Sequence, residues 1–208
     1  MFWYQWLSVI ALLICLLSCF YHTYKIIRLG NPPEYARRAG NIGKAVRYSF
    51  TGAMSPKVKE SAYMHMPTYI AGIIYHMGTF LAIFLFILAF FNVWIQGWII
   101  WALVAVLLAS GLCGLGILLK RINKHELRSL SNPDDYISNI LVTAFQMITA
   151  FALIDFSYIP AYYIITSLLL LYFPLGKLKH AVYFFAARYH LGYFYGWRGV
   201  WPPKPIKK

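Results

Sequence analysis

The chain has few charged residues, and acidic ones are the scarcest. Asp, Glu, Lys and Arg make up 12% of the 208 residues, and only 6 of these are acidic. Acid–base catalysis and proton transport through a membrane ordinarily depend on carboxylates inside the fold. The long apolar segments of this chain contain no Asp or Glu. An acid–base enzyme and a small transporter are therefore both disfavoured.

Several chemical motifs are also missing. The three cysteines, Cys15, Cys19 and Cys113, lie within apolar runs, and no CxxC pair or Cys/His cluster has the spacing of a zinc or iron–sulfur site. The sequence has no glycine-rich phosphate loop, no GxSxG element and no HExxH motif. We expect the cysteines to be packing residues, with no catalytic group of these kinds.

Apolar residues dominate instead. They make up 61% of the chain, and the mean hydropathy is +0.60, which is typical of integral membrane proteins. Five stretches approach the roughly 20 residues needed to cross the hydrocarbon core. They predict an all-α membrane protein with five transmembrane helices in a single domain, at about 2–20, 69–93, 98–119, 137–154 and 159–180. The fourth is the shortest, and Asn139 and Gln146 interrupt it.

The basic residues indicate the orientation. All 19 lie in the first loop, the third loop or the C-terminal region, whereas Asn92–Gly97 and Asp155–Ile159 contain none. The positive-inside rule then places the N-terminus outside and the C-terminus in the cytoplasm. This distribution explains the net charge of +13 without a nucleic-acid partner.

Two polar regions would face the cytoplasm. The basic loop at 21–61, in which Asn31-Pro32-Pro33 should break any helix, could bind anionic lipid headgroups or an acidic partner, or its charges could serve topology alone. The aromatic and basic tail at 181–208 contains Tyr193–Trp197, which suits a membrane interface or a docking surface.

Four histidines occur in an antiparallel register. The position numbers of His76 and His180 sum to 256, and those of His65 and His190 sum to 255, as expected for residues at matched depth on antiparallel helices. Paired imidazoles at matched depth are typical axial ligands of haem iron. The alternative is that each histidine hydrogen-bonds at the interface or between helices.

His76 and His180 are the first choice for haem ligands. His76 lies about two turns inside the second segment, and Gly78 beside it would let a flat macrocycle approach. A second haem at His65 and His190 is a further alternative, although His65 lies about 40 Å along a helix from Asn92, beyond the hydrocarbon core. Pro67 marks a helix start or a kink next to His65, and Gly192 and Gly196 should weaken a rigid helix around His190. We expect His22 and His125 to be solvated in loops.

The stretch Leu170-Leu171-Tyr172-Phe173-Pro174-Leu175-Gly176-Lys177-Leu178-Lys179-His180 carries a family resemblance. It resembles the fifth-helix motif of the respiratory nitrate reductase gamma subunit family. This family includes the membrane cytochromes of heterodisulfide reductase and dissimilatory sulfite reductase-linked complexes. Tyr75-His76-Met77-Gly78 is similar to the start of the family's second helix, and the resemblance covers the second to fifth segments and the C-terminal region.

The resemblance implies a b-type cytochrome of a prokaryotic cytoplasmic (inner) membrane. His76 and His180 would bind the haem nearer the cytoplasm, and electrons would pass between the quinone pool and a cytoplasmic-side iron–sulfur subunit. The family's second pair of ligands would fall at Phe86 and Tyr162, so the outer haem should be missing.

We therefore expect an electron-transfer subunit of an oxidoreductase complex, with one haem b or two and with quinone as the exchanging substrate, and not a stand-alone catalyst. Lys177 and Lys179 should raise the haem potential through their positive charge. The competing hypothesis is a haem-free membrane anchor that docks a soluble partner through its basic loops.

Overall fold

The computed structural model describes residues 2–30, 33–56, 58 and 64–203. Within these ranges the chain forms helices and no strand. The α-helices are α1 (Trp3–Leu29), α2 (Ile42–Phe50), α4 (Met66–Phe90), α5 (Ile99–Asn123), α6 (His125–Ser129), α7 (Pro133–Ile154), α8 (Ile159–Tyr172) and α9 (His180–Trp197). Short 3-10 turns cover Gly52–Met54, Phe156–Tyr158 and Lys177–Lys179.

Four helices, α1, α4, α5 and α7, are long and apolar enough to cross a membrane, and α8 with α9 counts as a fifth span if the two are taken together as one broken span. The described part of the chain is therefore all-helical, and its four or five long apolar helices suit a multi-pass membrane protein. Helix α4 begins at Met66, directly before Pro67, as the sequence predicts.

The first loop is shorter than the sequence indicates, because α1 continues past residue 20 to Leu29. An apolar run indicates the part of a helix that suits the hydrocarbon core. The helix itself can continue beyond that part into polar surroundings. The predicted break at Asn31-Pro32, the cations Lys57, Lys59, Lys204, Lys207 and Lys208, and the loop end at Ser61 lie outside the described residues.

The expected fifth helix at 159–180 is interrupted. Helix α8 ends at Tyr172, and the amides of Leu175 and Gly176 both donate to the Tyr172 carbonyl, at 3.0 and 3.1 Å. Pro174 lies in this turn and has no N–H for a helical hydrogen bond. His180 consequently begins α9 and does not end the preceding span.

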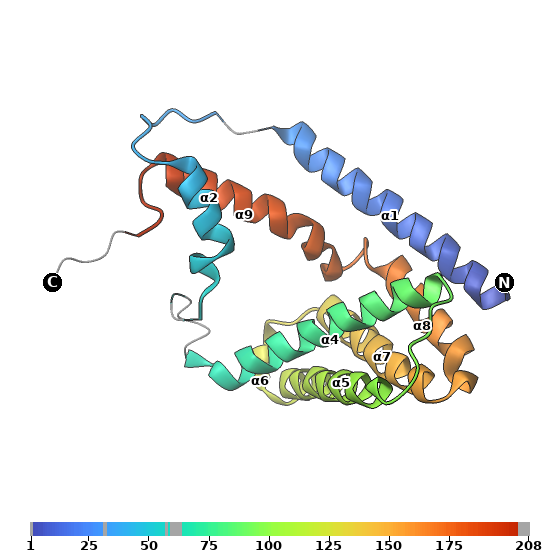
Figure 1. Cartoon of the computed structure of the whole chain (residues 1–208). Coiled ribbons are helices and arrows are strands. Elements are labelled where there is room, and N and C mark those ends of the chain that lie inside the picture. The colour runs from blue at the N-terminus through green and yellow to red at the C-terminus, as the bar shows by residue number, and fades with distance from the viewer. Residues whose placement is uncertain (1, 31–32, 57, 59–63, 204–208) are drawn as a thin grey trace. The chain divides into compact units, whose positions relative to one another are not determined.

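The chain divides into two compact units. The bundle unit comprises Met1–Ser18 and Pro67–Leu178, and the clasp unit comprises Cys19–Met66 and Lys179–Lys208. In the bundle unit, α7 packs against α5 and α8 (Figure 1). Its apolar core is built mostly from α4, α5, α7 and α8.

In the clasp unit, α2 lies against α9 (Figure 1). The Asn41 side chain caps α2 by accepting from the Lys44 amide at 3.0 Å. A Cβ added at Gly192 would collide with the Val46 backbone, and one at Gly196 with Ala45. The two glycines therefore allow close helix contact, and α9 runs without interruption through both of them.

Candidate functional site

Helix α4 has two unlike faces. Gly78, Ala82 and Phe86 are buried in the bundle unit, whereas His76 and Phe80 are exposed. The alternation follows from the 3.6-residue helical period, which places residues three and four apart on one side. The His76 ring lies 6.4 Å from the Phe80 ring, one turn along. His76 thus belongs to the face of α4 that the bundle core does not cover.

The opposite face is held by a buried polar network. Gln146 of α7 has no exposed surface, and its Nε2 donates to the Tyr75 carbonyl at 3.0 Å and to Thr79 Oγ1 at 2.7 Å. Ser110 of α5 donates to Gln146 Oε1 at 2.7 Å. Hydrogen bonding inside the fold is what polar side chains need at membrane depth. The network therefore anchors α4 at the residue before His76.

Gly78 does not serve the role expected of it. A Cβ at this position would collide with the Ser110 side chain, so the glycine allows α5 to approach α4. Because Gly78 is buried and His76 is exposed, the two residues lie on different sides of the helix. The prediction that Gly78 opens space for a macrocycle beside His76 is wrong.

Phe86 and Tyr162 contact each other. They stand where the family that the motif resembles would have the ligands of its outer haem. The Phe86 and Tyr162 rings lie 6.4 Å apart, and Phe145 stacks on Tyr162 at 6.3 Å. All three side chains are at most 5% exposed. The adjoining cavity, lined in part by Leu85 and Thr149, has about 10 Å³ of space for a water-sized sphere. In this structure, aromatic side chains fill the space between these two positions.

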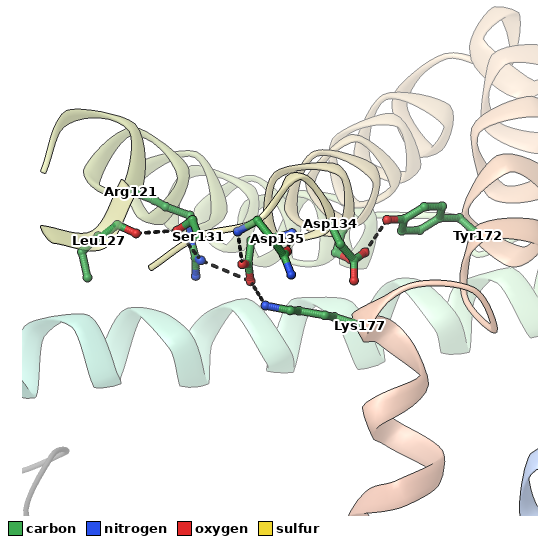
Figure 2. Close-up of polar contacts among 9 residues, drawn as sticks. Arg121, Leu127, Ser131, Asp134, Asp135, Tyr172 and Lys177 are labelled. Atoms are coloured by element: carbon green, nitrogen blue, oxygen red, sulfur yellow. Dashed lines mark hydrogen bonds and ion pairs between the residues drawn. The ribbon is translucent and has the colours of Figure 1, made fainter. Parts of the chain in front are cut away.

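The turn in the family-like motif is tied to the start of α7 (Figure 2). Lys177 Nζ lies 2.7 Å from Asp135 Oδ1, and Arg121 of α5 lies 3.2 Å from the same oxygen. The Tyr172 hydroxyl donates to Asp134. Asp135 also completes a capping box with Asn132, which stabilises the α7 N-terminus. The motif residues Tyr172 and Lys177 thus join three helix ends.

This geometry revises the expected electrostatics of the motif. Asp135, which Lys177 shares with Arg121, offsets part of the charge of Lys177, so Lys177 is a weaker source of positive potential than the sequence indicates. His180 is exposed at the first position of α9. His76 belongs to the bundle unit and His180 to the clasp unit.

The other histidines differ in their surroundings. His65 is exposed directly before α4, and His190 is half-buried on α9, with its ring 5.7 Å from that of Tyr189. His125 is exposed, whereas His22 lies in α1 and its Nδ1 is 3.0 Å from the Tyr183 hydroxyl. The prediction that both residues lie in loops is therefore wrong, because His22 lies in α1 and His125 begins α6.

Sequence reasoning missed the roles of Gln146 and Ser110. The available signal was Gln146 itself, an uncharged polar residue inside an apolar segment. Polar residues at membrane depth usually face other helices. Among the described residues, no group of three or more His, Cys, Asp or Glu side chains is placed to hold a metal ion.

No family model, curated protein or solved structure matches the chain. The resemblance to the nitrate reductase gamma subunit family therefore depends on the motif residues themselves.

Proposed function

We propose that this protein is the b-type cytochrome subunit of a respiratory membrane complex, with His76 and His180 as axial ligands of one haem. The observation that carries the proposal is the position of His76 on the exposed face of an apolar, membrane-length helix. An imidazole on such a face is costly in a bilayer unless it has a function there. Iron ligation would supply that function.

The chain's own residues would position the haem and tune it. Each imidazole would bind iron through one ring nitrogen, and the hydrogen bonds of Gln146 and Ser110 would keep α4 from rotating at His76. When bound, the haem would carry one electron at a time. Lys179 would favour the reduced state through its charge.

The contact between Phe86 and Tyr162 supports a protein without the outer haem. These two aromatic rings occupy the position of the outer haem, so His76 and His180 would hold the one haem, which would supply electron exchange with quinone. His65 and His190 remain the residues to test for a second haem.

The proposed topology follows the basic loops. The N-terminus would lie outside, the C-terminus in the cytoplasm of a prokaryotic cell, and an iron–sulfur subunit would bind on the cytoplasmic side. Substrate chemistry would then belong to a partner subunit.

Optical spectroscopy of the purified protein tests the haem proposal. We expect a reduced-minus-oxidised difference at the b-type α-band, which His76→Ala or His180→Ala removes and the control His125→Ala retains. Haem quantification by pyridine haemochrome should give one haem per chain. A fully assembled protein without the band would contradict the proposal, and two haems sensitive to His65→Ala and His190→Ala would show that the second pair is also occupied.

A haem-free membrane anchor is the second candidate function. The exposed cations Arg37, Arg38, Lys44 and Arg47 of the clasp unit favour it, because such a cationic surface could attract an acidic soluble partner. The same spectrum decides between the two functions.

A further inference from the structure

The clasp unit has a cationic stripe along α2. Ala45 and Ser49 are buried, and the Ser49 hydroxyl donates to the Arg188 carbonyl of α9 at 2.8 Å. Lys44 and Arg47 are exposed and lie three residues apart, so they occupy neighbouring positions on the helix surface. The packing through Ala45 and Ser49 thus leaves both cations directed away from α9.

Exposed phenylalanine rings continue this stripe. Phe50, which follows Arg47 by three residues, lies 6.2 Å from the Phe184 ring and 6.3 Å from the Phe185 ring of α9. Phe185 is 66% exposed and Phe50 is 36% exposed. The Arg188 guanidinium lies 5.7 Å from the centre of the Phe184 ring. Cations and apolar rings therefore share one continuous surface.

Little negative charge balances this unit. Among its described residues, Glu34 is the only carboxylate side chain, and Arg198 binds it through two hydrogen bonds of 2.6 and 3.0 Å. The ion pair with Arg198 occupies both carboxylate oxygens. The exposed cations of α2 are thus suited to an external anion.

We propose that the face formed by Lys44, Arg47, Phe50, Phe184, Phe185 and Arg188 binds the anionic phospholipid headgroup layer of the membrane. The cations would pair with lipid phosphates while the phenylalanine rings enter the acyl boundary, a combination typical of interfacial helices.

A lipid surface explains this face better than a soluble acidic protein does. Charge alone suits either ligand, but exposed phenylalanines gain free energy only where they leave water. The clasp unit is also continuous in sequence with the apolar helices α1 and α4. A bilayer is therefore present at high effective concentration without a separate partner.

Hydrogen–deuterium exchange of the full chain in lipid nanodiscs tests the proposal. The α2 amides, Ile42–Phe50, should exchange more slowly in phosphatidylcholine with phosphatidylglycerol than in phosphatidylcholine alone. Removal of each cation should weaken the binding of this face to anionic lipid roughly fivefold. Lys44→Gln with Arg47→Gln should therefore abolish the difference in α2 exchange between the two lipid compositions. Phe185→Ser should reduce it in a second, independent variant.

The chain supplies a matched control in α1. Lys25 and Arg28 are also exposed and three residues apart, so Lys25→Gln with Arg28→Gln removes the same charge elsewhere and should leave the α2 difference intact. Circular dichroism would confirm that each variant is folded. Equal α2 exchange in both lipids, or an unchanged difference after Lys44→Gln with Arg47→Gln, would overturn the proposal. If added polyglutamate, but not phosphatidylglycerol, slows the exchange of the α2 amides, the face would instead be assigned to an acidic protein partner.

Discussion

The bundle unit and the clasp unit build their helix contacts from side chains of different size. In the bundle unit, Gln146 and Ser110 have no exposed surface and bond to other helices, and large rings such as Tyr162 fill the remaining core. In the clasp unit, the helix contact is made at Gly192 and Ser49, while the cations Lys44 and Arg47 of α2 lie at the surface.

The difference reflects the length of the helices and their surroundings. Membrane-length helices already satisfy their backbones and gain specificity from side-chain hydrogen bonds and shape. Helix α2 has 9 residues, too few for stability in isolation, and depends on close contact with α9. The bundle unit should therefore be most sensitive to lost volume, and the clasp unit to added volume.

The largest effect is expected from removing a core ring of the bundle unit. Tyr162→Ala should lower the free energy of unfolding by about 3–5 kcal/mol, because it leaves a cavity between Phe86 and Phe145. Unfolding by SDS titration in mixed micelles measures this loss. The control Phe80→Ala removes a ring that is 65% exposed and should cost much less. Equal costs would show that this ring cluster is not a packed core.

The clasp unit should respond to one added methyl group. Gly192→Ala places a Cβ against the Val46 backbone and should weaken the α2–α9 contact by about 1–3 kcal/mol. Faster hydrogen exchange at Ile42–Phe50 would reveal the weakening. Gly116→Ala is the matched control, because nothing lies within 4 Å of its added Cβ. An unchanged exchange rate in Gly192→Ala would show that the contact is loose.

The buried network should have a smaller effect than the core rings. Gln146→Leu keeps the site filled but leaves the Ser110 and Thr79 hydroxyls without their bonds to Gln146, at a cost of about 1–2 kcal/mol. SDS titration again measures it. The control Thr149→Val loses only a hydroxyl bond to the Phe145 carbonyl in its own helix. If the two variants are equally stable, the network contributes no specific energy between helices.

The smallest expected effect concerns the acid response of the clasp unit. The Ala36 amide and then the Arg198 guanidinium hold the pKa of Glu34 below its ordinary value of 4.5. A lowered pKa in the folded state adds stability above the ordinary pKa, and this stability is lost as the pH falls through the folded value. NMR of the labelled Glu34 carboxyl should show the low pKa, and Arg198→Gln should raise it. A pKa unchanged by this substitution would contradict the ion pair's role.

Part of the fold could be predicted because hydropathy is local. The apolar runs place the spanning helices, and Pro67 marks the start of α4 correctly. The ends of the helices were harder to predict from the sequence. Helix α1 continues to Leu29 because leaving the hydrocarbon does not end a helix, and the turn after Tyr172 depends on Asp134 and Asp135, about forty residues earlier in the chain.

The sequence by itself determined the class of this protein: an all-helical membrane chain whose apolar segments each satisfy their own backbone hydrogen bonds, so the information lies within each segment. Only the tertiary structure decided which face of α4 exposes His76, that Ser110 fills the space beside Gly78, and that α2 packs on the glycines of α9. These features depend on side chains that are distant in sequence. Helical periodicity predicts which residues share a face of a helix, but not which other residues pack against that face.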